Sequence, residues 1–212
     1  MFEDAYASKQ STYQPLSTRM RPQTLDEMLG QDHLLGKGCV FRNFVEDDDI
    51  PSFVLWGPPG SGKTTLARLV GGKSNSYFIG VSGVASGVAE IRKIVMEAQK
   101  LVRSTGQQTI LFIDEIHRFN KAQQDVILPY VEDGVFILIG ATTENPGFEI
   151  IPPLLSRSRV FTLDRLGSNH IEILINRAIS DCHRGLGSYS AVIEDKAAKF
   201  LADIVNGDAR LA

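Results

Sequence analysis

Two adjacent carboxylates, Asp114 and Glu115, stand at the end of the apolar segment "TILFID" and the start of the basic, amide-rich segment that follows it. Carboxylates at the end of a buried strand cost free energy unless they have a partner. Such a pair therefore either holds a cation or takes part in chemistry. Which of the two applies depends on what the rest of the chain brings to the same place.

The segment "GPPGSGKT" (57–64) matches the phosphate-loop pattern G-x-x-x-x-G-K-[ST], between an apolar run and a helical pattern. Its three glycines let backbone N–H groups face phosphates, and the helix that follows offers its positive end. We expect Lys63 to reach the terminal phosphates and the Thr64 hydroxyl to ligate Mg²⁺. The candidate nucleotide-binding residues here are Gly57, Pro58, Pro59, Gly60, Ser61, Gly62, Lys63, Thr64 and Thr65.

This loop gives the two carboxylates a function. Ligands of parallel α/β sheets gather at the carboxyl ends of the strands, where Asp114 is expected to lie. Asp114 is predicted to hold Mg²⁺, through water because Mg²⁺ gives up its hydration shell reluctantly. Glu115 is the better candidate for polarising the attacking water. The predicted cofactors are therefore ATP and Mg²⁺.

Five apolar segments alternate with helical patterns, which predicts an α/β fold with a parallel five-stranded sheet flanked by helices. The strands are expected at 52–56, 77–81, 109–114, 135–142 and 159–163.

The helices have recognisable ends. Thr24 and Glu27 have the spacing of a capping box, before a short helix that should end at Gly30. Further helices are expected over 64–70, ended by Gly71 and Gly72, over 88–103, which is amphipathic, and over 121–133, which Pro129 should kink or shorten.

The pattern changes after Leu166 to helices only, at 168–183 and 194–205, and Asn206-Gly207 should end the second. We therefore predict a flexible lead-in over 1–15, a nucleotide-binding α/β core over 16–166 and a partial helical lid over 167–212.

Composition limits the function classes. Hydrophobic residues make up 43% of the 212 residues, so global disorder is excluded. The net charge of −3 means that any DNA contact needs a local basic patch. Cys39 and Cys182 form neither a disulfide framework nor a zinc site. With no apolar run long enough to span a membrane and no signal peptide, a cytoplasmic protein is expected.

Taken together, these motifs resemble an AAA+ ATPase, and more closely the RarA/MgsA family of replication-associated recombination proteins, in a bacterial form. That family is similar to the Werner-helicase-interacting ATPases and related to clamp loaders and the Holliday-junction branch-migration motor. The resemblance covers roughly 16–212. It rests on "LSTRMRPQTLDEMLGQDHLLG", "LWGPPGSGKTTLAR", "TILFIDEIHRFNKAQQDVILPYVEDG", "LIGATTENPGFE", "LLSRSRVF" and "NGDAR".

The resemblance implies further roles. Arg157 is identified with the arginine finger that completes a neighbouring subunit's site, with Arg159 as the alternative. Thr142 is identified with the sensor-1 residue, with Thr143 as the alternative, and Arg210 with sensor 2.

At the adenine side, the resemblance implies a pocket that begins at Arg21, Pro22 and Gln31. Gly83 and Val84 depart from the family pattern, and we expect this departure to touch neither phosphate, metal nor water.

The implied function is a DNA-dependent ATPase that works as a homo-oligomer at stalled forks, gaps or ends, with this chain by itself as a possible monomer. Its partners would be single-stranded, gapped or forked DNA, contacted through the DNA backbone, and replication proteins such as single-stranded DNA-binding protein. Arg118 and Lys121 could face DNA or only solvent, and the basic face of 88–103 is open to the same two readings. The alternative functions are a nucleotide-gated scaffold and a clamp-loader or branch-migration subunit. The expected location is the bacterial cytoplasm, at the nucleoid.

Overall fold

The computed structural model describes residues 14–83 and 87–212, so the predicted lead-in lies outside the described residues as far as residue 13. The described chain forms two compact units. Gln31–Pro58 and Gly62–Leu163 form the first, here called the sheet unit. The described residues up to Gly30, together with Pro59–Ser61 and Asp164–Ala212, form the second, here called the helical unit.

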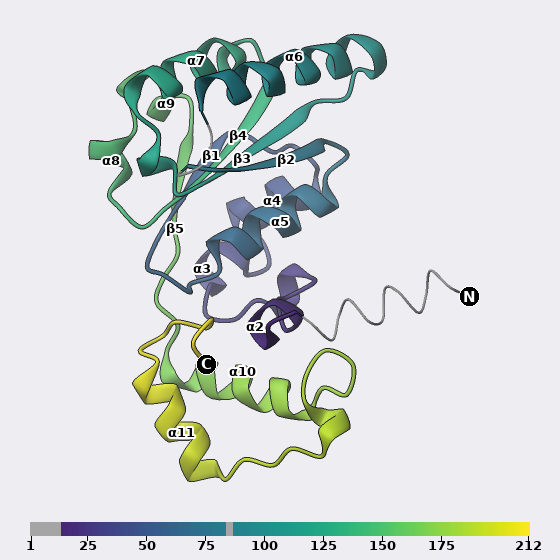
Figure 1. Cartoon of the computed structure of the whole chain (residues 1–212), viewed down its shortest axis with the longest axis vertical. Helices are drawn as coiled ribbons and strands as arrows, with labels where there is room; N and C mark the ends of the chain where they lie inside the picture. Colours follow the sequence, from purple (N-terminus) through teal and green to yellow (C-terminus); the bar gives the residue numbers. More distant parts are fainter. Residues whose placement is uncertain (1–13, 84–86) are drawn as a thin grey trace. The chain divides into compact units, whose positions relative to one another are not determined.

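The sheet unit contains a five-stranded, fully parallel sheet in the order β2-β3-β4-β1-β5, which confirms the predicted α/β fold (Figure 1). Every residue of β4 is buried, as expected for an inner strand of a parallel sheet. The strands are β1 (Phe53–Trp56), β2 (Tyr77–Ser82), β3 (Thr109–Asp114), β4 (Phe136–Thr142) and β5 (Arg159–Thr162).

Helices cover both faces of this sheet, with α6 and α7 on one face and α4 and α5 on the other (Figure 1). The α6–α7 side holds the larger hydrophobic core, and on the opposite side the rings of Phe41, Phe53 and Phe161 meet edge to face. The helices of the unit are α3 (Asp32–Leu35), α4 (Val40–Glu46), α5 (Lys63–Lys73), α6 (Val88–Thr105), α7 (Lys121–Glu132), α8 (Pro146–Glu149) and α9 (Pro152–Leu155), with a 3₁₀ turn, η2 (Ile116–Arg118).

The predicted end of the helix that follows the phosphate loop is wrong. Helix α5 continues through Gly71 and Gly72 to Lys73. An added Cβ at Gly71 would overlap the Phe78 ring, so this glycine serves close packing and not a helix end. Helix α7 contains Pro129 in its last turn and still runs to Glu132, so the proline does not shorten it.

The predicted capping box at Thr24 is also wrong. The Thr24 side chain makes no capping hydrogen bond, and only a 3₁₀ turn, η1 (Leu25–Glu27), follows it. Helix α7 has the capping box instead: Asn120 accepts from the Gln123 N–H at 3.0 Å, and the Gln123 side chain accepts from the Asn120 N–H at 2.9 Å.

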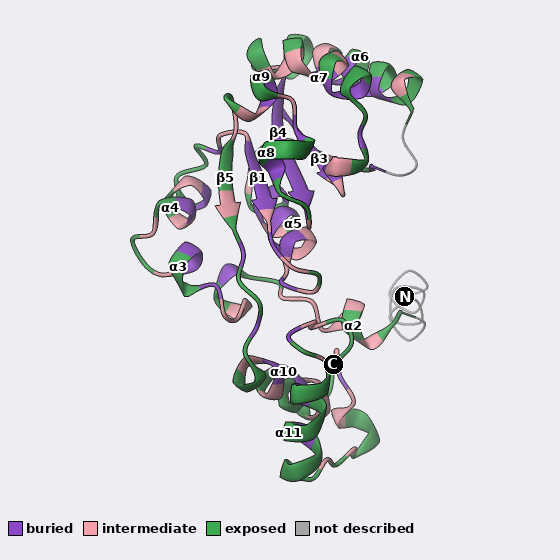
Figure 2. Cartoon of the chain, turned by 90° about the vertical axis from the view of Figure 1, so that its left-hand side faces the viewer, coloured by how far each residue is buried: buried purple, intermediate pink, exposed green. Residues whose placement is uncertain are grey.

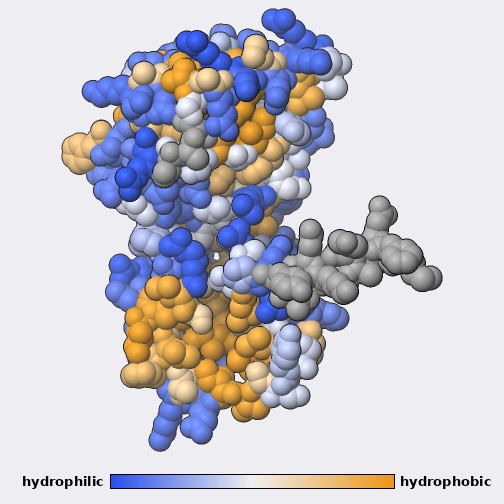
Figure 3. Space-filling model, in the orientation of Figure 1, coloured by the Kyte–Doolittle hydropathy of each residue, from blue (hydrophilic) through white to orange (hydrophobic). Residues whose placement is uncertain are grey.

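The helical unit is built on the pair α10 (Ser168–Ser180) and α11 (Asp195–Ile204), with α2 (Leu16–Arg19) and η3 (Gly187–Tyr189). Figure 2 shows that burial in this pair is confined to a narrow strip. That strip is Ile171, Ile175, Ala198 and Ala202, and Leu166, just before α10, packs with it. Apolar side chains remain at the surface of this unit (Figure 3), among them Phe200, Leu201 and Ile204 of α11.

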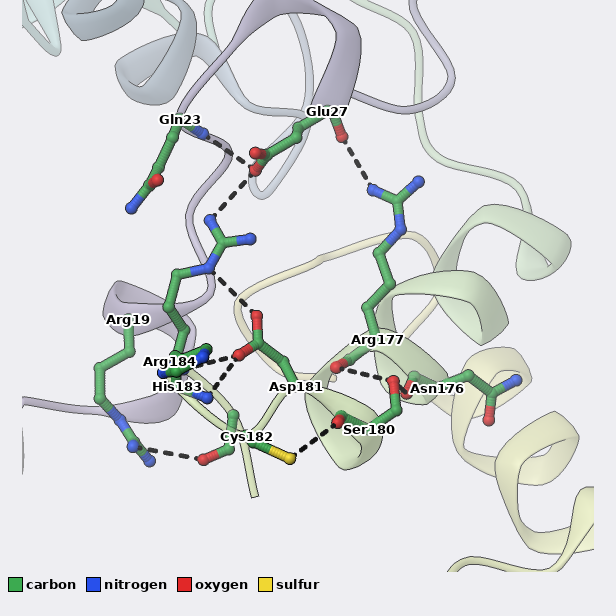
Figure 4. A network of polar contacts seen from close by, with 11 residues as sticks. Arg19, Gln23, Glu27, Asn176, Arg177, Ser180, Asp181, Cys182, His183 and Arg184 are labelled. Carbon is green, nitrogen blue, oxygen red and sulfur yellow. Dashed lines mark hydrogen bonds and ion pairs between the residues drawn. The ribbon is translucent and has the colours of Figure 1, made fainter. Parts of the chain in front are cut away.

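A polar network joins α10 to the N-terminal part of the helical unit (Figure 4). Helix α10 ends at Ser180, three residues before the predicted end, and Asp181 accepts hydrogen bonds from the backbone N–H groups of Arg184 and His183. These two bonds, with the Arg184 side chain, lower the pKa of Asp181 to about 2. Arg184 also pairs with Glu27 at 3.1 Å, so Glu27 serves this network and not a helix cap.

Helix α11 ends as predicted, because Asn206 and Gly207 adopt left-handed backbone conformations directly after it. No helix within the described ranges is long and apolar enough to cross a membrane.

Candidate nucleotide-binding and hydrolysis site

The phosphate loop leaves β1 at Trp56 and enters α5 at Lys63. Gly62 has φ of 101°, a conformation that a residue with a Cβ rarely adopts, and this turn starts the helix. The Lys63 ammonium is buried and donates to the carbonyl oxygens of Gly57 at 2.7 Å and Pro58 at 2.8 Å. The loop therefore folds around the charge that was predicted to bind phosphate.

The tip of the loop belongs to the helical unit, where it borders Asp208. A Cβ at Gly60 would overlap the Asp208 carboxylate. That carboxylate accepts from the backbone N–H of Arg210 at 2.9 Å and pairs with its guanidinium at 3.2 Å. The predicted sensor-2 arginine is thus paired, within its own unit, with an acid that packs against the phosphate loop.

The candidate metal corner joins the start of α5 to the end of β3. The Thr64 hydroxyl donates to Asp114 Oδ2 at 3.1 Å. A hydroxyl and a carboxylate are the hard oxygen donors that Mg²⁺ takes alongside water and phosphate oxygens. In the described residues no group of three or more His, Cys, Asp or Glu side chains could hold a metal. The hydroxyl and the carboxylate therefore fit a nucleotide-bound Mg²⁺.

Glu115 follows directly, in a left-handed conformation with φ of 55°. Its carboxylate lies 3.2 Å from Nδ1 of His117, and the same Nδ1 lies 3.0 Å from the Thr142 hydroxyl at the end of β4. The predicted base and the predicted sensor-1 residue thus contact the same nitrogen of one imidazole. Thr143, the alternative sensor, is half-buried next in the chain.

Gly83 lies against the same turn. Its N–H donates to the Asp114 carbonyl at 2.8 Å, and an added Cβ would overlap the Glu115 carbonyl oxygen. The departure at Gly83 is therefore closer to the site than we expected, whereas Val84 lies outside the described residues.

The two finger candidates differ in their surroundings. Arg157, which follows α9, pairs with Glu132 at the end of α7 at 2.6 Å and donates to the Pro153 carbonyl at 2.8 Å, yet stays exposed. Arg159 begins β5, and its guanidinium lies over the Phe44 ring at 4.7 Å. Both arginines are exposed; Arg157 is held by a carboxylate and a carbonyl, whereas Arg159 lies over an aromatic ring of α4.

The predicted adenine-side residues divide between the units. Gln31 is buried at the start of α3 in the sheet unit, and Arg21 and Pro22 are half-buried in the helical unit. Two basic candidates for DNA contact, Arg118 in η2 and Lys121 at the start of α7, are both exposed.

Sequence reasoning missed His117 and Gln124. The Gln124 side chain, almost fully buried, donates to the Phe119 and Glu149 carbonyls and accepts from the Ile151 N–H, so it joins the loop after β3 to the α8–α9 connection. His117 and Gln124 both lie in the family-like segment "HRFNKAQQD", whose residue types alone do not show which carbonyls or side chains they contact.

A strand, a phosphate loop and a carboxylate pair in this arrangement define a P-loop ATPase. Residues 53–165 match the family model described as "ATPase family associated with various cellular activities". The chain belongs to this AAA family, and the AAA domain implies nucleotide binding.

Sequence relatives narrow this class. Replication-associated recombination protein A of Escherichia coli (strain K12) is 47% identical over 202 residues, which cover 95% of this chain and 45% of that protein. ATPase WRNIP1 of Dictyostelium discoideum is 45% identical over 204 residues, which cover 96% of this chain and 23% of that protein. The resemblance to the RarA/MgsA family is thereby confirmed. This chain spans less than half the length of these relatives.

Among solved structures, the Holliday junction branch migration motor RuvB of Thermotoga maritima superposes with a TM-score of 0.72 at 30% identity. The match covers 91% of this chain and 62% of that protein. It confirms the AAA+ fold.

Proposed function

We propose that the protein is a DNA-dependent ATPase that works as a homo-oligomer and remodels or processes DNA at stalled replication forks, gaps or ends. The observation that carries this proposal is the 3.1 Å hydrogen bond between Thr64 and Asp114, which joins the phosphate loop to the carboxylate pair. Membership of the AAA family supports ATP as the nucleotide. The names of the relatives, which refer to replication-associated recombination and branch migration, support DNA as the substrate.

Each site residue has a proposed task. ATP would supply the phosphoanhydride bond that is hydrolysed, and Mg²⁺ would offset the negative charge of the phosphates. Lys63 binds the terminal phosphates, Thr64 and Asp114 hold Mg²⁺, and Glu115 takes a proton from the attacking water. Arg157 offers its guanidinium to the site of a neighbouring subunit.

The remaining assignments extend the site. Residues 16–166 are proposed as the nucleotide-binding core and 167–212 as part of a lid. The other nucleotide-side candidates are the phosphate-loop residues from Gly57 to Thr65, Thr142 or Thr143 as sensor 1, Arg210 as sensor 2, and Arg21, Pro22 and Gln31 beside the adenine.

DNA would be bound through its phosphates. Arg118 and Lys121 are exposed directly after the carboxylate pair and would supply positive charge there. Binding of this kind is salt-sensitive and carries no base readout. Single-stranded DNA-binding protein is the proposed protein partner, and the nucleoid in the cytoplasm the proposed location.

A second candidate function is a nucleotide-gated scaffold in which ATP controls assembly and hydrolysis is incidental. The observation that favours it is that both hydrolytic side chains have partners within the chain: Glu115 contacts His117, and Arg157 pairs with Glu132. In a scaffold these contacts would persist with ATP bound.

The ATPase rate of the full-length protein, with and without single-stranded, gapped and forked DNA, separates the two functions. Lys63→Ala should lose nucleotide binding, and Glu115→Gln should bind ATP but lower kcat at least about 100-fold. Stimulation by DNA supports the first function, whereas a rate indifferent to every DNA form supports the scaffold. Normal turnover by Glu115→Gln would refute the role of Glu115.

A further inference from the structure

His117 lies between the ends of two neighbouring strands of the sheet unit. It belongs to η2, just after β3, and its side chain is mostly buried. Its Nδ1 contacts the Glu115 carboxylate at 3.2 Å and the Thr142 hydroxyl at 3.0 Å. One ring nitrogen thus contacts two groups that the proposed function places in the same reaction.

The contacts define which atom carries the proton. A bare Nδ1 would turn its lone pair toward the Glu115 carboxylate at 3.2 Å, which is repulsive. A protonated Nδ1 donates to the carboxylate and to the Thr142 oxygen together. We therefore assign the proton of His117 to Nδ1, shared between Glu115 and Thr142.

The Thr142 hydroxyl has little hydrogen-bonding capacity left for a nucleotide. Thr142 is fully buried. Its oxygen accepts from the Glu144 N–H at 3.0 Å and contacts His117, and its hydroxyl donates to the Glu144 carbonyl at 3.3 Å. A hydroxyl has one proton and two lone pairs, so these contacts use its full capacity.

Thr142 is also connected to the phosphate loop through its backbone. Its carbonyl accepts from the Gly57 N–H at 3.2 Å, and the Gly57 carbonyl accepts from the Lys63 ammonium at 2.7 Å. Polar contacts, linked through the covalent backbone at Thr142 and Gly57, therefore connect Glu115, through His117, to the lysine that is proposed to bind phosphate.

We propose that His117 is a positioning residue: its Nδ1–H aims the Glu115 carboxylate and couples it to Thr142, which acts through His117 and not by touching the nucleotide. This proposal rests on the proposed function, in which Glu115 is the base. The Nδ1–H contact fixes one carboxylate oxygen and thereby the orientation of the whole group. Thr142 fixes the imidazole in turn, and the Thr142 backbone ties both to the phosphate loop.

Three substitutions of His117 test the position of the donor. Asparagine places its amide nitrogen where Nδ1 stands, glutamine places it farther out, and alanine removes it. His117→Ala and His117→Gln should lower kcat about 10- to 100-fold with little change in the KM for ATP, because only orientation is lost. His117→Asn should recover most of the loss. Binding of a fluorescent ATP analogue should be unchanged in all three.

A double-mutant cycle tests the path through Thr142. Thr142→Val should lower kcat on the scale of His117→Ala, Thr142→Ser should restore it, and the double variant should be no worse than either single one. Multiplying effects would mean that Thr142 contacts the nucleotide directly, which overturns this part of the proposal.

The ring nitrogens give an independent readout. The chain has four histidines, so ¹⁵N spectra of the wild type and His117→Asn identify the His117 signals by difference. Nδ1 should carry the proton; a proton on Nε2 with Nδ1 bare contradicts the proposal. Full activity of His117→Ala beside an inactive Glu115→Gln would overturn the role of His117 alone. An active Glu115→Gln would instead overturn the proposed function.

Discussion

Two polar networks in this protein use carboxylates for different ends. In the helical unit, Arg184 stands between Glu27 and Asp181, at 3.1 and 3.2 Å, so a permanent cation meets both acids. At the carboxyl edge of the sheet, Asp114 and Glu115 meet a hydroxyl and an imidazole instead. Acids already neutralised by a guanidinium are poor metal ligands and poor bases. The sheet edge therefore keeps its carboxylates available, and the helical unit uses its own to hold structure.

The charges of the helical network show its structural purpose. The hydrogen bond with Glu27 is the main cause that raises the pKa of Arg184. Partial burial raises the pKa of Glu27, but the Gln23 N–H and Arg184 outweigh it and the pKa is lowered. All three groups are thus stabilised in their charged forms by one another. If the two networks have these different roles, substitutions at the sheet edge should lower kcat, and substitutions in the helical network should lower the free energy of unfolding.

The largest effect is expected from Gly83→Ala at the sheet edge. The new Cβ would overlap the Glu115 carbonyl oxygen, a backbone atom that cannot swing aside. The turn that carries Glu115 must therefore shift, and a shift of about 1 Å at a catalytic group lowers kcat by about 100-fold. The measurement is steady-state ATPase of the full-length protein, with nucleotide affinity determined separately.

Gly87→Ala is the matched control for Gly83→Ala, because a Cβ at Gly87, just before α6, meets no atom of the described residues within 4 Å. Its kcat should stay within about twofold of the wild type. A Gly83→Ala variant that is equally active would show that the backbone contact does not position Glu115.

The same two networks show how far sequence reasoning reaches. The phosphate loop and Asp114-Glu115 were predictable because a contiguous pattern carries each of them. The contact between His117 and Thr142 joins positions 25 apart, and Gly83 approaches Glu115 from another strand. Such pairs depend on strand order and register, which composition and periodicity do not determine.

The capping box at Thr24 failed for the same reason. The local pattern was right, but the Glu27 carboxylate pairs with Arg184, which lies 157 positions along the chain. Helix α5 likewise runs past its predicted glycine end because Gly71 packs against Phe78. Long-range contacts override local helix preferences where they bury more apolar surface or pair more charges.

An intermediate effect is expected from Glu27→Gln, which removes one charge from the helical network. We expect the free energy of unfolding of the helical unit to fall by about 1 kcal/mol at neutral pH, since the pair is partly exposed. Faster hydrogen exchange of α10 amides should report the loss. Trp56, the single tryptophan, lies in β1 and should show an unchanged fluorescence transition.

Glu46→Gln is the control for Glu27→Gln. It breaks the Arg42–Glu46 pair, an i, i+4 pair along α4 whose Glu46 side chain is exposed, and this should cost only about 0.3 kcal/mol. If the Glu27 and Glu46 variants lower the free energy of unfolding by equally small amounts, the helical network does not stabilise its unit. The proposed difference between the two networks would then be wrong.

The smallest effect is expected from Asp181→Asn, and only in acid. Backbone hydrogen bonds from Arg184 and His183 hold the pKa of Asp181 at about 2, below its ordinary value of 3.8. The folded state therefore binds this proton more weakly than the unfolded state, so the contribution to stability is complete above pH 3.8 and is lost as pH falls toward about 2. Urea midpoints followed by circular dichroism through this window should fall more steeply for the wild type than for Asp181→Asn. Asp125→Asn, on the exposed side of α7, should keep the wild-type slope. Equal slopes for the wild type and Asp181→Asn would mean that the Asp181 carboxylate gains no stabilising hydrogen bonds on folding.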